Sequence, residues 1–260
     1  MNYFPYLLVL LLGATPPPTV AQTMGLVAGY QALFGPAEGL NTIVDRYNSS
    51  SSRDLREPLS DFRQLRGWSI RFLYSKDEVR MRKLLFDFGF DHRAQRREAV
   101  EVAPITGEAT DRQLRLALHT GNVGVHLPLF VKNSWFGYGG LRAQVGVLSV
   151  GDRSDDGDWQ RLQRSFYGDL EVVVRLVTNL TRTLGSGTNK SGWVLSIEPY
   201  YTIGADVFDG QTHNLSEADR VFNPNLTSSS PAELPLNLRG LGLRVSIGFL
   251  ISLPRSSFTP

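Results

Sequence analysis

The stretch Gly67-Trp68-Ser69-Ile70-Arg71-Phe72-Leu73-Tyr74-Ser75 determines the fold class expected for this chain of 260 residues. Large apolar and aromatic side chains stand at Trp68, Ile70, Phe72 and Tyr74, and mostly smaller or polar ones stand between them. Successive side chains of a β-strand point to opposite faces, so this alternation gives one apolar and one polar face. Such a strand is typical of a barrel wall that separates lipid from a polar lumen.

The same period of two residues recurs in seven further segments, which are 24–32, 83–91, 122–129, 140–147, 169–176, 193–203 and 240–251. Their apolar faces carry no Asp, Glu, Lys or Arg, whereas the opposite faces carry charges of both signs. An arginine or lysine that faces lipid near the bilayer midplane costs about 2–4 kcal/mol, which explains the segregation. The pattern predicts an all-β fold, an eight-stranded antiparallel up-and-down transmembrane β-barrel. A soluble β-sandwich, in which the apolar faces of two sheets meet, is the alternative.

Closure of the barrel is a physical requirement. An open strand edge in hydrocarbon leaves backbone groups unsatisfied, at a cost of several kcal/mol each. An even number of strands is therefore expected, and segment 24–32 is counted although its alternation is the weakest. Pro199 lies within segment 193–203 and has no backbone N–H to donate, so it predicts a bulge there.

The connections between these segments indicate the orientation. In outer-membrane barrels, short periplasmic turns alternate with long extracellular loops. Short turns are predicted at 76–79 and 132–134, and long connections at 35–66, 92–120, 151–165 and 207–237. The 179–191 connection is longer than a periplasmic turn usually is. Because 92–120 begins and ends with a strand-like pattern, it is also compatible with a hairpin that extends beyond the membrane.

The first 21 residues differ in composition from the rest. An apolar run over 6–13 is followed by three prolines and by Thr19-Val20-Ala21, small residues of the kind that precede a signal-peptidase site. The run is too short for a spanning helix. We therefore expect a signal peptide over 1–21 and a barrel over 22–260. The absence of cysteine excludes disulfides and thiolate metal sites, and the net charge of +2 argues against a nucleic-acid partner.

The chain resembles the small eight-stranded barrels of the outer membrane protein A and W type, and most of all the porin-family barrels of Bacteroidota. The resemblance covers 22–260 and rests on the strand pattern, the loop alternation and the amphipathic last strand over 240–253. The segment Gly39-Leu40-Asn41-Thr42-Ile43-Val44-Asp45-Arg46-Tyr47-Asn48 is similar to one found in those proteins. The resemblance implies an integral protein of the outer membrane of a Gram-negative bacterium.

The charged residues on the polar faces form the first candidate site. The interior of an eight-stranded barrel is just wide enough for side chains to fill it, and an unpaired buried charge is costly. We therefore expect a lumen ion-pair network of Arg71, Lys83, Asp87, Arg142, Glu171, Arg175, Glu198 and Arg244. Such a network is either a closed plug or a narrow ion path that opens when pairs switch.

A second candidate site is a set of arginines at the outer rim. Arginine suits bidentate contact with phosphate, so contact with lipopolysaccharide is predicted for Arg66, Arg93, Arg96 and Arg97. The expected partners are outer-membrane lipid, lipopolysaccharide and other envelope proteins. An acidic loop over 152–158 departs from the EF-hand pattern, so a weak calcium site is the alternative to a solvated loop. No metal and no cofactor are otherwise expected.

The histidines give little indication of catalysis. His119 and His213 lie in predicted long connections near hydroxyl groups, but no spacing in the chain matches a catalytic triad or dyad. We expect a non-enzymatic barrel with a structural or surface-interaction role in the cell envelope. The alternatives are a narrow porin-like channel for ions or small solutes, and an outer-membrane enzyme that processes lipid or peptide.

Overall fold

The computed structural model describes residues 22–49, 54–75, 84–102, 107–132, 134–155, 157–180, 191–204, 215–223 and 238–253. The predicted signal peptide, Lys83 and His213 lie outside these residues, as do the turn at 76–79 and most of the connections 179–191 and 207–237. The signal peptide therefore stays a prediction.

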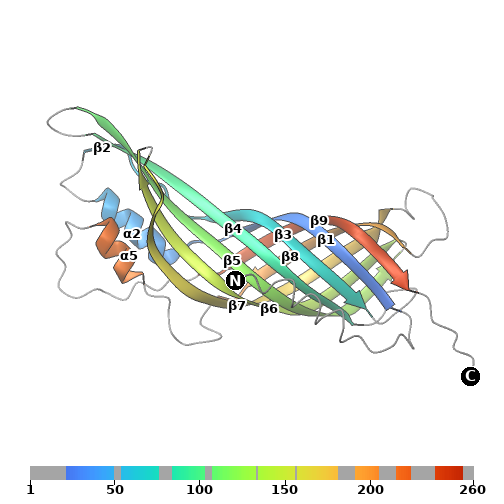
Figure 1. Cartoon of the computed structure of the whole chain (residues 1–260). Coiled ribbons are helices and arrows are strands. Elements are labelled where there is room, and N and C mark those ends of the chain that lie inside the picture. Colours follow the sequence, from blue (N-terminus) through green and yellow to red (C-terminus); the bar gives the residue numbers. More distant parts are fainter. Residues whose placement is uncertain are drawn as a thin grey trace, which may run out of the picture.

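Eight strands form a closed ring (Figure 1). In ring order they are β1 (Gln22–Phe34), β3 (Gln64–Ser75), β4 (Leu85–Val102), β5 (Ala109–Lys132), β6 (Trp135–Ser154), β7 (Gln160–Asn179), β8 (Gly192–Thr202) and β9 (Gly240–Leu253). Each strand pairs antiparallel with the next, and β9 closes the ring on β1. The short β2 (Asp54–Glu57) pairs only with the end of β4. The predicted eight-stranded antiparallel up-and-down barrel is confirmed.

The stagger of the strands follows from their register. A row of paired residues that starts at Tyr30 and passes through β3, β4, β5 and β6 reaches β7 at Phe166. The row that leaves Tyr30 in the other direction reaches β7 at Leu176, ten residues away. With a rise of about 3.4 Å per residue and about 4.8 Å between strands, this stagger corresponds to a strand tilt of about 40°.

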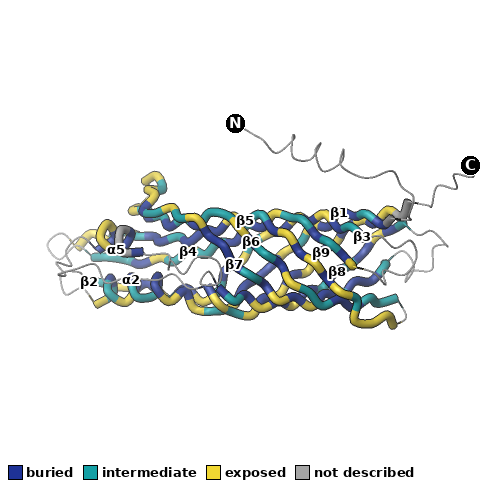
Figure 2. Tube along the Cα trace, turned by 90° about the horizontal axis from the view of Figure 1, so that it is seen from below, coloured by how far each residue is buried: buried dark blue, intermediate teal, exposed yellow. Residues whose placement is uncertain are grey.

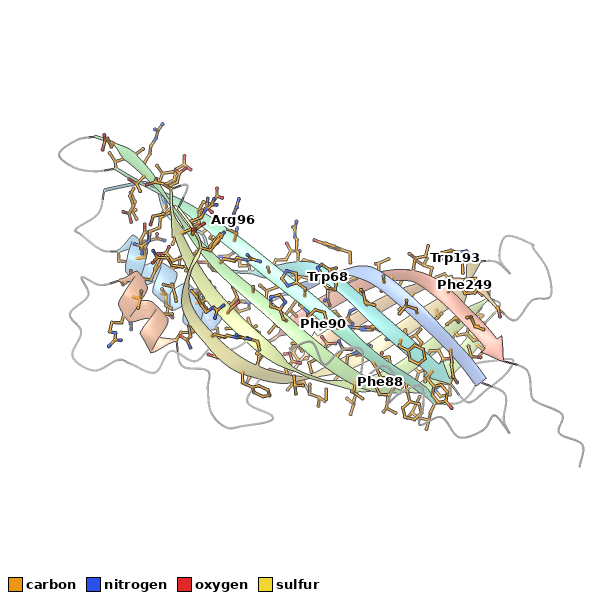
Figure 3. All side chains as sticks on the ribbon, in the orientation of Figure 1. Trp68, Phe88, Phe90, Arg96, Trp193 and Phe249 are labelled. Carbon is orange, nitrogen blue, oxygen red and sulfur yellow. The ribbon has the colours of Figure 1, made fainter. Side chains whose placement is uncertain are left out.

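The barrel is apolar outside and polar inside. Leu26, Leu127 and Leu241 expose 58%, 61% and 67% of their surfaces, although leucine is normally an interior residue. Trp68, Phe90, Trp193 and Phe249 also project from the outer wall (Figure 3). The described strands form one sheet that closes on itself, and no second sheet among the described residues covers this surface. The soluble sandwich is therefore excluded, and Figure 2 shows exposed and buried residues alternating along the wall.

Two of the predicted long connections consist largely of strand. The hairpin of β4 and β5 extends through most of 92–120, and β6 and β7 extend through most of 151–165. A membrane needs only about 9–11 residues of a tilted strand, so these four strands project beyond it. The hairpin extension that the sequence allowed for 92–120 is confirmed. The turn at 132–134 is confirmed too, because β5 ends at Lys132 and β6 begins at Trp135.

The projecting strands surround two helices at one end of the barrel (Figure 1). Helix α2 (Glu38–Asn48) occupies part of the predicted loop 35–66, and α5 (Ser216–Phe222) occupies part of 207–237. Residues Leu40, Ile43, Val44 and Tyr47 of α2 recur at helical spacing and are all buried. Neither of the two described helices is long and apolar enough to cross a membrane. This end of the molecule, with its helices and projecting strands, is called the cap.

The bulge predicted at Pro199 is wrong. The register between β7 and β8 is the same at Val173–Tyr200 and at Leu176–Ile197, so no residue is inserted between them. Between these two pairs, Glu198 and Pro199 have no partner in the β7–β8 ladder, and proline has no backbone N–H to donate to it. Among the described strands, register shifts lie at Pro128–Phe130 in β5, beside Val150–Gly151 between β6 and β7, and between Leu55 and Glu57 of β2.

Candidate functional site

The middle of the lumen is filled by charged side chains that the strand alternation points inward. Each exposes 2% of its surface or less, so water does not solvate them from outside. The members are Arg71, Arg93, Arg142, Arg175, Arg244, Asp87, Asp91, Asp169, Glu171 and Glu198. Five positive and five negative residues give a formally neutral set. Charges buried in this way are tolerable only when they pair with one another.

Arg142 is at the centre of this ion network. Its guanidinium group donates to Asp87 at 2.7 Å, to Glu171 at 2.9 Å and to Glu198 at 2.8 Å. The three carboxylates belong to three different strands, β4, β7 and β8. Arg175 also pairs with Asp87 and Glu198, so two arginines share two acids. One side chain thus joins strands on several sides of the barrel.

The part of the network nearer the cap is built on Asp91. Arg71 donates to both of its carboxylate oxygens at 2.9 Å, and Arg244 and Arg93 donate to it at 3.1 and 3.3 Å. Arg93 also donates to Glu171 at 2.8 Å. The guanidinium group of Arg244 lies 4.6 Å from the ring centre of Tyr200, which adds a cation–π contact. The pairs therefore form one connected network along the lumen.

The structure brings seven of the eight predicted lumen residues into these contacts, and Lys83 lies outside the described residues. Sequence reasoning missed Arg93, which it assigned to the outer rim. That assignment is wrong, because Arg93 has the same strand parity as Asp87 and Asp91 and points into the lumen. The alternation that continues beyond Asp91 was the available signal. His126 was also missed as a partner, and its Nε2 lies 2.8 Å from Asp87.

Apolar layers lie on both sides of the ion network. At the end away from the cap, a cluster of buried side chains occupies the lumen, consisting of Val27, Leu73, Leu85, Tyr138, Val177, Val194 and Leu250. On the cap side, the inward faces of β5 and β6 supply Leu114, Leu116, Leu118, Leu148 and Val150, which pack in one cluster with α2 and α5. The lumen is thus filled in three layers, apolar, ionic and apolar.

A second ion pair fastens α5 to the strands. Arg112 of β5 donates to Asp152 of β6 at 2.9 Å, and its guanidinium group lies 4.2 Å from the ring centre of Phe222. Burial disfavours the charge, but the hydrogen bond and the charge of Asp152 raise the pKa of Arg112 above the usual arginine value. Arg46 of α2 pairs with Asp219 of α5. These contacts hold the helices against each other and against the wall.

The other three predicted rim arginines lie apart from one another. Arg66 is exposed and donates to Gln64 at 2.6 Å, and Arg96 is exposed and pairs with Glu98 at 2.7 Å. Arg97 points inward, where its guanidinium group lies 6.0 Å from the ring centre of Phe62. Arg66 and Arg96 therefore remain candidates for contact with an external ligand, whereas Arg93 and Arg97 face the interior.

The acidic loop does not form a metal site among the described residues. Asp152 is paired with Arg112, and Asp155 closes the turn by accepting a hydrogen bond from the backbone N–H of Asp111 at 3.0 Å. The backbone of Asp155 has a φ of 47°, a conformation that aspartate tolerates in turns. Asp156 lies outside the described residues. In the described part of the chain, no three His, Asp or Glu side chains are grouped as metal ligands would be.

His119 does not lie in a loop, as predicted, but on the outer face of β5. Its Nδ1 atom is 3.2 Å from Nδ1 of His92 on β4, and the two rings stack at 4.5 Å between their centres. Trp68 and Phe90 lie beside them at 5.9 and 6.3 Å. The four rings form an aromatic patch on the outer wall of the barrel.

The chain is similar in structure to several solved proteins. No family model matches the sequence, and no curated protein matches it significantly. Ail, the attachment invasion locus protein of Yersinia pestis, solved with the heparin analogue sucrose octasulfate, aligns over 88% of this chain and 99% of its own, with 10% identity and a TM-score of 0.39. Neisserial surface protein A aligns over 90% and 97%, with 11% identity and a TM-score of 0.35.

The outer membrane protein OprG from Pseudomonas aeruginosa aligns over 89% of this chain and 97% of its own, with 9% identity and a TM-score of 0.36. At this level of similarity, the function of the chain has to be inferred from its own residues. The finer resemblance to the A and W type and to the porin family of Bacteroidota stays a prediction.

Proposed function

We propose that this chain is an integral, non-enzymatic protein of a Gram-negative outer membrane, exported with a leader over 1–21, whose plugged barrel anchors a rigid cap at the cell surface. The outer faces of the eight strands are apolar over a continuous belt. On β9 this belt runs from Leu241 to Ile251, about 25 Å along the axis at the tilt of the strands, which matches the apolar band of outer-membrane barrels.

The layered lumen is the observation that carries the choice between anchor and channel. A channel needs a continuous polar path, but the ion network lies between two apolar layers. Within the network, each described carboxylate of Asp87, Asp91, Glu171 and Glu198 contacts at least two arginines. Opening a path would separate pairs that cannot be solvated, which is costly. A porin-like channel is therefore the second candidate and is disfavoured.

Planar-bilayer recording of protein purified from outer membranes tests this function. The expected result is no reproducible conductance step from protein shown to be inserted and folded. A variant with Arg71→Ala and Arg142→Ala loses two lumen charges, and Arg56→Ala with Arg63→Ala serves as its control on exposed cap residues. Steady steps from the unmodified protein that change in the lumen variant, and not in the control, would establish the channel instead.

A further inference from the structure

The outer face of β4 to β7 carries a group of arginines just beyond the apolar belt. Arg96 of β4 is directly opposite Arg115 of β5, and this row continues through Gly151 of β6 to Arg161 of β7. Like charges that face each other across a strand pair are destabilising. The adjoining row contains Ala94, Ala117 and Ser149, and ends at Arg164 of β7. Arg96, Arg115 and Arg164 are called the basic band.

The tilt of the barrel places the three arginines at one height. Paired rows climb towards the cap by about 3 Å per strand from β3 to β7, because rows run perpendicular to tilted strands. Arg164 lies on the row of Ala117, which is one row further from the cap than the row of Arg115. It is also two strands further along the ring, and the rise of the rows towards the cap over these two strands offsets that difference in height. The three guanidinium-bearing positions therefore differ by no more than about 5 Å along the barrel axis. They lie on the cap side of the outward-facing apolar residues of β4, β5 and β7.

Little negative charge balances this band. Among the described residues, no carboxylate lies within ion-pair distance of Arg115 or Arg164, and Arg96 contacts only the exposed Glu98. Arg115 instead lies 5.9 Å from the ring centre of Trp159, which Arg153 approaches at 5.5 Å. Three positive charges are thus gathered here with one paired carboxylate, that of Glu98.

The surface below the band is apolar and aromatic. Phe166, which follows Arg164 on the outer face of β7, lies on the membrane side of the arginines together with His119 and His92. Trp68 and Phe90 lie further from the cap. Figure 3 shows Arg96 nearer the cap than Trp68 and Phe90. Ala94, Ala117 and Ser149 have small side chains, so the surface beside the arginines has room for their guanidinium groups to approach one ligand. A ligand that contacts both the basic band and this apolar surface carries anionic groups on its headgroup and acyl chains on its membrane side.

We propose that the basic band binds the phosphate groups of a phosphorylated glycolipid of the outer leaflet, with its acyl chains against Phe166 and the belt. Arginine holds phosphate by paired, charge-assisted hydrogen bonds. The ligand supplies negative charge beside Arg115 and Arg164, for which no carboxylate lies within ion-pair distance among the described residues. This site rests on the proposed outer-membrane location. Of the rim arginines predicted from the sequence, only Arg96 belongs to the basic band.

Native mass spectrometry of protein purified from outer membranes in mild detergent tests the proposal. The probes are diphosphoryl lipid A, the same glycolipid with its phosphates removed, and inorganic phosphate. Binding of diphosphoryl lipid A is expected to be at least about tenfold tighter than binding of the dephosphorylated form. A variant with Arg96→Gln, Arg115→Gln and Arg164→Gln is expected to lose that preference. The control Arg56→Gln, Arg63→Gln and Arg220→Gln removes equal charge from exposed cap positions and is expected to keep it.

Equal affinity for both glycolipids, or full retention by the band variant, would overturn the proposal. Displacement by inorganic phosphate at an equal phosphate concentration would also overturn it, because the site would then recognise free phosphate. If the band variant does not fold, Arg115→Gln alone is measured in the same way and is expected to weaken binding about threefold or more. Failure of the unmodified protein to fractionate with outer membranes is a different result, since it contradicts the proposed function itself.

Discussion

Arg142 and Glu198 form a bidentate pair across the lumen, with donor–acceptor distances of 2.8 and 3.0 Å between their two nitrogens and two oxygens. They are 56 positions apart in the sequence and belong to β6 and β8, which are not neighbours in the ring. The pair therefore crosses the interior and connects two strands that are not hydrogen-bonded to each other. Because Arg142 also contacts Asp87 and Glu171, its removal affects three carboxylates at once.

Replacing Arg142 by methionine is expected to lower the unfolding free energy of the barrel by about 3–5 kcal/mol, since breaking a buried pair leaves uncompensated charge. Arg142→Lys keeps the charge but not the planar fork, so an intermediate loss is expected. The measurement is denaturant unfolding in lipid vesicles, followed by tryptophan fluorescence. Arg63→Met, at a highly exposed residue paired with Asp61, is the control. A loss no larger than that of the control would show that the network does not stabilise the barrel.

Arg71 and Asp91 allow a sharper test of pairing, because Arg71 donates to both oxygens of Asp91 at 2.9 Å. Arg71→Met and Asp91→Leu are each expected to destabilise. The double variant is expected to destabilise less than the sum, because it removes both members of this pair and leaves neither without the other. The coupling energy is expected to be about 1–3 kcal/mol. It should change little between low and high salt, since buried pairs are poorly screened. Additive effects would mean that the two residues do not act as a pair.

The cap is expected to open independently of the barrel when Arg112 is replaced by alanine. This change removes the ion pair with Asp152 and the contact with the ring of Phe222. Hydrogen exchange read by mass spectrometry should accelerate in peptides that cover α5, while β9 stays protected. Arg220→Ala, at an exposed position of the same helix, is the matched control. Equal acceleration in β9 would show that cap and barrel unfold as one unit.

The barrel could be predicted from the sequence because period-two alternation is local, whereas the cap could not be predicted from the same pattern. The alternation of β4 continues to Arg93 and beyond, and the sequence allows either a long connection or a hairpin over 92–120. A strand that faces lipid cannot carry the charged residues that follow Asp91. Beyond the membrane, outward-facing strand positions can carry charge, so the strands can continue there. The helical spacing of Leu40, Ile43, Val44 and Tyr47 in α2 was present in the sequence. The burial of this face depends on strands that are distant in the chain, so the spacing alone does not place the helix.

The partners within the lumen were the least predictable feature. Strand parity shows which charges point inward, but which of them meet depends on the stagger, which no single segment encodes. Asp87 and Asp91 have the same parity on β4, yet Asp87 pairs with Arg142 and Arg175, and Asp91 with Arg71 and Arg244. The rim prediction failed for a different reason. Arg93 and Arg97 share the inward strand parity of Asp87 and Asp91, which the alternation along β4 already indicates.

Two glycines provide a matched test of packing inside and outside the wall. A Cβ atom added at Gly242 would lie 2.0 Å from Cζ of Tyr200, a side chain that packs against Arg244. Gly242→Ala therefore has to displace the ring, and overpacking of this kind costs about 1–3 kcal/mol. At Gly121, on the outer face of β5, the nearest atom would be the carbonyl oxygen of Val145 at 3.9 Å. Gly121→Ala is expected to be neutral or slightly stabilising, because alanine loses less conformational freedom on folding. Unfolding in vesicles measures both variants, and equal losses at the two positions would contradict the tight contact between Tyr200 and β9.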